Sequence, residues 1–130
     1  MSESDNLRVV YLYRDAGNYK YWRAVVLRNP KGVGAAYFEK RLRAAFMVDG
    51  IFVASDIRLP DLFPYTNATA TTDDHCFHEL HSVESTTDAS TDPFSRTIDG
   101  FLLEAEAAAA RGWSTFLPGD PLERRFKLQL

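Results

Sequence analysis

Residues 7–13 read Leu-Arg-Val-Val-Tyr-Leu-Tyr, and residues 19–27 read Tyr-Lys-Tyr-Trp-Arg-Ala-Val-Val-Leu. Both segments are rich in β-branched and aromatic side chains, which favour strands. Between them, residues 14–18 (Arg-Asp-Ala-Gly-Asn) supply turn chemistry, because Gly and Asn accept positive φ angles and Asp bonds to nearby backbone. The sequence therefore predicts a β-hairpin, and the rest of the fold is built outward from it.

Two helices are predicted downstream of the hairpin. Residues 33–48 repeat apolar side chains at helical spacing, and Glu39 and Arg43 form a favourable i,i+4 pair on the polar side. Residues 91–93 (Thr-Asp-Pro) predict a helix start, with a capping side chain followed by proline at the first helical position. The second helix is therefore expected over residues 93–111, before a glycine that ends it.

Three further strands complete the predicted sheet. Residues 51–54 form a short apolar run that can continue to Leu59, and residues 75–83 predict a fourth strand. Residues 122–130 alternate apolar and polar side chains, which predicts a final strand with one buried face. The element order β-β-α-β-β-α-β predicts an α+β fold. We expect a two-layer sandwich in which a mainly antiparallel sheet carries two helices on one face.

The length suits a single α+β domain over residues 1–130. We expect residues 1–6 to be disordered because they are polar and acidic. Residues 60–74 and 84–92 are rich in Pro, Thr, Ser and Asp and are expected to form long loops.

The composition is that of an ordinary globular domain, with 45% hydrophobic residues, 25% charged residues and a net charge of -3. No stretch approaches the roughly 18 apolar residues of a membrane span, and no secretory leader pattern opens the chain. The single cysteine excludes an internal disulfide and fits a reducing compartment. We therefore expect a cytoplasmic protein with no membrane partner.

All three histidines and the only cysteine lie within residues 75–81. Imidazole and carboxylate groups bind zinc and similar divalent ions, so this segment predicts a metal-binding protein or metal-dependent enzyme. The candidate ligands are His75, His78, His81 and Asp74. Strand geometry opposes the hypothesis, because alternation sends the first and last histidines to one face and the middle one to the other.

No other catalytic set is assembled in the sequence. Cys76 could act as a nucleophile only with an imidazole in hydrogen-bond reach, and its strand neighbours point away from it. The alternative is a buried, inert thiol. The sequence therefore favours a binding protein over an enzyme.

Aromatic and basic residues are interleaved along the hairpin, as they are in sheet platforms that hold single-stranded nucleic acid. The candidate residues are Tyr11, Tyr13, Arg14, Tyr19, Trp22 and Arg23. The alternative is a half-buried hairpin whose aromatics form a core face and whose arginines face solvent. Residues 1–60 carry a net charge of +4, residues 61–121 carry -9 and residues 122–130 carry +2. This acidic balance disfavours nucleic acid.

The same residues suit an interface with another protein or with a second copy of the chain, since aromatic and arginine side chains anchor interfaces. The final predicted strand adds Phe126 and Leu128 as candidates, because a one-sided strand can pair at a sheet edge. Protein binding, including formation of a homodimer, is therefore the leading hypothesis for function. Metal chemistry and nucleic-acid binding are the alternatives.

The segment Tyr-Leu-Tyr-Arg-Asp-Ala-Gly-Asn-Tyr-Lys, residues 11–20, resembles the start of small uncharacterised bacterial proteins. The resemblance implies a bacterial or phage origin and a small cytosolic protein. It transfers no activity and no site. Within it, Asp15 and Asn18 are expected to shape the turn.

Overall fold

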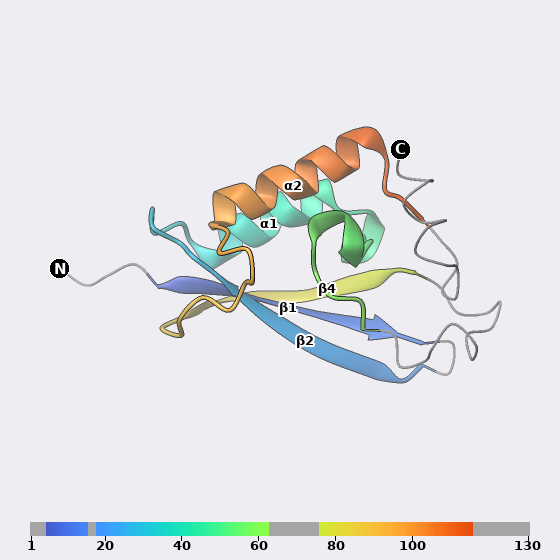
Figure 1. The fold of residues 1–130 in the computed structure, drawn as a ribbon, viewed down its shortest axis with the longest axis horizontal. Helices are drawn as coiled ribbons and strands as arrows, with labels where there is room; N and C mark the ends of the chain where they lie inside the picture. The colour runs from blue at the N-terminus through green and yellow to red at the C-terminus, as the bar shows by residue number, and fades with distance from the viewer. Residues whose placement is uncertain (1–4, 16–17, 63–75, 116–130) are drawn as a thin grey trace.

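The structure, a computed structural model, describes residues 5–15, 18–62 and 76–115. These residues form an antiparallel sheet in the order β2-β1-β4-β3. The strands are β1 (Asn6–Arg14), β2 (Lys20–Leu27), β3 (Ile51–Phe52) and β4 (His78–Thr86). Helices α1 (Ala35–Ala45) and α2 (Ile98–Arg111) lie together over one face of the sheet (Figure 1). The predicted α+β class, with an antiparallel sheet and two helices on one face, is confirmed.

The predicted hairpin is present as β1 and β2, which pair in register from Leu7 opposite Leu27 to Arg14 opposite Lys20. In the turn, the Asp15 carboxylate accepts the backbone N–H of Tyr19 at 2.9 Å, and Asn18 adopts a φ of 67°. A positive φ is tolerated by Asn better than by most side chains. These two residues therefore shape the turn as predicted.

The hydrophobic core fills the space between the sheet and the two helices. Every second residue of β1 contributes to it, because alternate strand side chains point to the same face. The buried residues of the core include Leu7, Val9, Tyr11, Val25, Leu27, Phe38, Leu42, Phe52, Phe101 and Leu102. Among the described residues, no helix lies over the other face of the sheet (Figure 1).

Helix α1 is shorter than the predicted 33–48 and ends at Ala45. The backbone of Met47 instead bridges to Ile51, and a short 3₁₀ helix, η1 (Val48–Gly50), follows. Asp49 has a φ of 61° inside η1, a conformation that an α-helix does not contain. The pairing of Met47 with Ile51 therefore replaces the last turn expected from periodicity.

Strand β3 has two residues, not the predicted 51–54 or its extension to Leu59. The chain then enters a second 3₁₀ helix, η2 (Ala54–Ile57). Ala54 and Ile57 are both fully buried. A 3₁₀ turn places residues three apart on one side, whereas a strand would separate them onto opposite faces.

Strand β4 covers His78–Thr86 instead of the predicted 75–83. It extends to Thr86 because it pairs along the whole of β1, as far as Asn6, with a register shift beside Val10. The start of the predicted loop 84–92 is therefore strand. Asn6 lies in β1 and not in a disordered start.

Helix α2 begins at Ile98 and not at residue 93. Its N-cap is Thr97, whose side chain accepts the backbone N–H of Gly100 at 3.2 Å. The Asp92 carboxylate accepts the backbone N–H of Arg96, and Ser95 has a φ of 51°, so the preceding residues form a turn. The predicted strand at 122–130 lies outside the described residues. Within the described part of the chain, no helix has the length and apolar character needed to cross a membrane.

Candidate functional site

The outer edge of β2 is divided into two parts, of which one is covered by the chain segment before α2. The backbone N–H of Val26 donates to the Thr91 hydroxyl at 2.9 Å, and its carbonyl accepts the Thr91 N–H at 3.0 Å. Just beyond β2, the backbone N–H of Arg28 donates to the Arg96 carbonyl at 3.2 Å, and the Arg28 carbonyl accepts the Ile98 N–H at 2.9 Å. We call the outward backbone groups of Val26 and Arg28 the covered edge.

A buried ion network fixes the covering segment in place. Arg96 donates to both carboxylate oxygens of Asp92, at 2.9 and 3.0 Å, and to the carbonyl of Ile57 at 2.7 Å. Glu104 on α2 accepts from Arg96 and from Arg58. Breaking a buried pair by removing one partner typically costs about 3–5 kcal/mol. The network therefore joins the covering segment firmly to η2 and α2.

The electrostatics of this network favour the ionised carboxylate. Burial alone would raise the pKa of Asp92, but hydrogen bonds from Arg96 and its positive charge outweigh the burial. The pKa of Asp92 is consequently below its ordinary value. The residue is charged and fully paired at neutral pH.

The second part of the same edge is bare. Because backbone groups on an antiparallel strand alternate in direction, Trp22 and Ala24 point their N–H and C=O groups the same way as Val26. In the described residues nothing pairs with these outward groups. We call the outward backbone groups of Trp22 and Ala24 the open edge.

Exposed aromatic side chains accompany the open edge. Trp22 lies on the helix-free face of the sheet with 51% of its surface exposed, and its ring meets the His81 ring edge-on at 4.9 Å. Tyr19, just before β2, is 71% exposed. Large aromatic side chains are enriched at protein interfaces relative to the rest of the protein surface. The open edge is therefore accompanied by large aromatic side chains that are at least half exposed.

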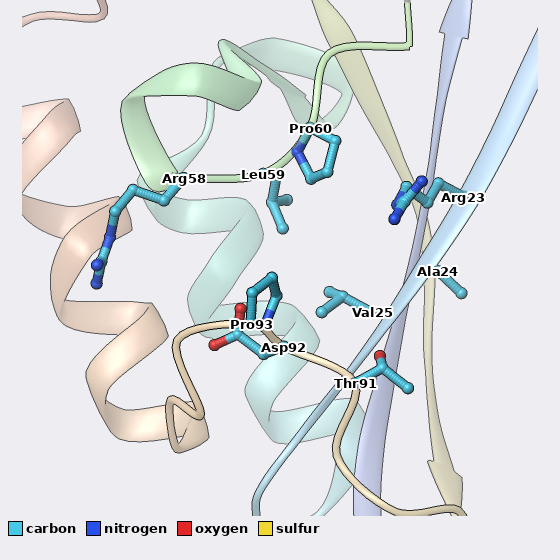
Figure 2. A pocket seen from close by; sticks show the side chains of 9 residues that line it. All are labelled: Arg23, Ala24, Val25, Arg58, Leu59, Pro60, Thr91, Asp92 and Pro93. Carbon is cyan, nitrogen blue, oxygen red and sulfur yellow. The ribbon is translucent and has the colours of Figure 1, made fainter.

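A pocket opens beside the open edge, on the helix side of the sheet (Figure 2). It has a volume of about 160 Å³. Three segments meet around it: β2, the residues after η2 and the residues before α2. Its lining residues are Arg23, Ala24, Val25, Arg58, Leu59, Pro60, Thr91, Asp92 and Pro93.

The two arginines of the pocket differ in their surroundings. Arg58 turns toward α2 (Figure 2). There it pairs with Glu104, and its guanidinium lies 4.2 Å from the centre of the Phe94 ring. Arg23 extends from β2 toward Pro60, and in the described chain its side chain forms no ion pair or hydrogen bond (Figure 2). Arg23 is therefore the cation that the pocket offers to an incoming group.

Tyr11 is a buried core residue that is tied to one of the lining residues of this pocket. Its hydroxyl donates to the carbonyl of Pro60 at 2.9 Å. Burial raises the pKa of Tyr11, the charge of Arg23 lowers it by a smaller amount and the charge of Asp61 adds to the rise. The phenol stays protonated and acts as a structural tie between β1 and the pocket rim.

Two of the predicted metal ligands, His78 and His81, lie within the described residues, and the structure does not bring these two together. His78 is fully buried, with Nε2 accepting the Leu62 N–H at 3.0 Å and Nδ1 3.3 Å from the Cys76 carbonyl. His81 lies on the opposite face of the sheet, against Trp22. Both ring nitrogens of His78 therefore already have protein partners. No group of three potential ligands occurs among the residues that the structure describes.

His75 and Asp74 lie outside the described residues, and metal binding, including zinc, stays a prediction. Cys76 is buried at 2% exposure, as expected for an inert thiol.

The predicted interface residues fall into two groups. Tyr11 and Tyr13 are fully buried on the helix side, where both pack against His78, so neither offers a stacking surface for nucleic acid. Trp22, Tyr19 and Arg23 remain accessible, as described above. The remaining candidates are Arg14, which pairs with Glu79 at 3.1 Å, and Phe126 and Leu128, which lie outside the described residues.

Two parts of the site were missed by sequence reasoning. Glu104 accepts from two arginines, and no pattern in the sequence singles it out. The i,i+4 spacing of Asp92 and Arg96 was an available signal for the ion pair, although it occurs here in a turn. The open edge at Ala24 has no sequence signal, because it depends on where a distant segment stops covering β2.

Comparisons with known proteins found no match for this chain. No family model, no curated protein and no solved structure matches the sequence or the fold. The site must therefore be interpreted from its own geometry.

Proposed function

We propose that the protein is a protein-binding module that takes an extended segment of a partner protein as an added strand on the open edge of β2. Strand addition uses the unpaired N–H and C=O groups of an edge strand, and side chains on both faces supply specificity. The bare backbone of Trp22 and Ala24, next to the exposed Trp22 ring, is the observation that carries the proposal.

Charge selects the kind of partner. Strand β2 carries Lys20 and Arg23 and has no acidic residue. An acidic segment would find opposite charges across the new strand pair, where they are favourable. A second copy of the chain would instead bring these positive charges together, so we assign the open edge to an acidic segment of another protein.

We also propose a bacterial and cytoplasmic setting for this interaction. Support comes from the single cysteine, which fits a reducing compartment, and from the resemblance of residues 11–20 to small bacterial proteins.

The test uses the full chain and two synthetic peptides, acetyl-(Val-Glu)₄-amide and acetyl-(Val-Lys)₄-amide. Backbone amide shifts are followed by NMR during titration. The proposal predicts that the acidic peptide changes the chemical shifts of the Trp22 and Ala24 amides, and that the basic peptide does not change them.

A matched pair of variants tests the role of the backbone. Ala24→Pro removes the outward N–H, which β1 does not use, whereas Ala24→Val retains it. We expect circular dichroism to show that the proline variant stays folded. We expect the acidic peptide to cause no amide shifts in the proline variant and to bind the valine variant. Binding by Ala24→Pro, or shifts located away from β2, would overturn the proposal. Concentration-dependent dimerisation that Ala24→Pro abolishes would reassign the edge to a second copy and overturn the assignment to another protein.

A further inference from the structure

The proposed strand addition needs a side-chain anchor, and this inference rests on that proposed function. Trp22 and Ala24 together offer about four main-chain hydrogen bonds to an added strand, each worth about 1 kcal/mol. A total of about 4 kcal/mol corresponds to a dissociation constant of about 1 mM, before the cost of ordering the segment. Specific binding therefore requires a further contact.

Strand geometry determines where the side chains of the added segment go. A residue placed opposite Ala24 shares its direction and faces the helix-free side of the sheet. The neighbouring residue, opposite Arg23, faces the helix side and points toward the pocket. This position brings one partner side chain to the rim of the 160 Å³ pocket.

The charged groups around the pocket determine which kind of partner side chain it can bind. Arg58 is engaged by Glu104, and Asp92 is engaged by Arg96. Asp61 acts electrostatically on Tyr11 but does not line the pocket. Among the charged residues that line the pocket, Arg23 is the one whose side chain has no ion pair or hydrogen bond within the described chain. A carboxylate matches the planar donors of its guanidinium.

We infer that the pocket beside β2 binds the carboxylate of an aspartate or glutamate on the partner strand, at the position opposite Arg23. The volume suits this role, because it is many times the roughly 10–15 Å³ that a cavity needs to hold one water and leaves room for a short side chain. Arg23 is then the residue that determines specificity, and the open edge supplies the general affinity.

The experiment compares Arg23→Gln with Lys20→Gln, using acetyl-(Val-Glu)₄-amide as the probe. Both variants remove one positive charge from β2, but Lys20 lies on the other face of the strand, since its side chain is an odd number of residues away. We expect Arg23→Gln to weaken binding about tenfold or more, and Lys20→Gln to weaken it no more than about threefold. We also expect Arg23→Glu to bind acetyl-(Val-Lys)₄-amide and the unmodified protein not to bind it.

The outcomes separate the two proposals. Equal losses in the two glutamine variants, with Ala24→Pro still abolishing binding, would overturn the carboxylate pocket and leave strand addition intact. Binding by Ala24→Pro would overturn strand addition itself. A failure of Arg23→Glu to accept the basic peptide would overturn the direct pairing of Arg23 with the partner side chain.

Discussion

The open edge and the covered edge follow one another along β2 and the residue after it. The outward backbone groups of the covered edge have hydrogen-bond partners, and those of the open edge have none among the described residues. At Val26, the segment before α2 supplies a hydroxyl and an N–H that satisfy the outward backbone groups. Two residues earlier, at Ala24, no described residue does so. The difference arises because Asp92 and Arg96 hold the covering segment against η2 and α2, so it stops short of Ala24. The outward N–H and C=O groups of this edge strand are unpaired only beyond the point where the segment before α2 stops bonding to them.

The largest effect is expected from removing the ion network under the covered edge. Asp92→Ala removes the bidentate and more deeply buried of the two carboxylate partners of Arg96, and we expect a loss of about 3–5 kcal/mol in the free energy of unfolding. Urea denaturation provides the measurement. Asp99→Ala, which removes an exposed partner of Lys31, serves as the control and should cost less than about 1 kcal/mol. Equal losses in both variants would show that the network does not hold the fold together.

The same substitution on the two edges should give different results. Val26→Pro removes the N–H that Thr91 accepts and disturbs a buried side chain, so we expect a loss of more than about 2 kcal/mol. Ala24→Pro removes an N–H with no described partner and should change stability by less than about 1 kcal/mol. Chemical denaturation of both variants checks the contrast. A large loss at Ala24 would mean that its edge is already paired.

A smaller effect is expected from the hydroxyl that covers Val26. Thr91→Val keeps the shape of the side chain but removes the acceptor of the Val26 N–H. We expect a loss of about 1 kcal/mol in the free energy of unfolding and faster hydrogen exchange at Val26. Unchanged exchange at Val26 would count against this hydrogen bond as the cover of the edge.

The smallest effect concerns pH. The pKa of Asp92 is lower in the folded state than in the unfolded chain, so its contribution to stability is present above about pH 4 and is lost as pH falls through the folded pKa. Urea midpoints between neutral and acidic pH should therefore fall less steeply in Asp92→Asn than in the unmodified protein. Parallel curves for the two proteins would contradict this linkage.

The class of fold could be predicted because its signals are local. The hairpin follows from two β-rich segments around Asp15 and Asn18, and both helices follow from apolar periodicity. The start of α2 could not be placed, because the turn that delays it depends on Arg96 bonding across to Ile57. Such contacts join residues distant in sequence, and spacing alone does not reveal them.

Only part of the site could be predicted from the sequence. Trp22, Tyr19 and Arg23 could be selected as interface candidates by residue type, and they do lie at the open edge or beside it. Residue type could not separate them from Tyr11 and Tyr13, which the strand alternation sends into the core. That separation requires knowing which face the helices cover.

The most direct test of the open edge is amide hydrogen exchange along β2, measured by NMR with and without acetyl-(Val-Glu)₄-amide. In the free protein we expect the Val26 and Arg28 amides to be protected, because both donate to the covering segment, and the Trp22 and Ala24 amides to exchange rapidly. The peptide should slow exchange at Trp22 and Ala24. Protection of these two amides in the free protein, or rapid exchange that the peptide leaves unchanged, would contradict the proposal that this edge receives a partner strand.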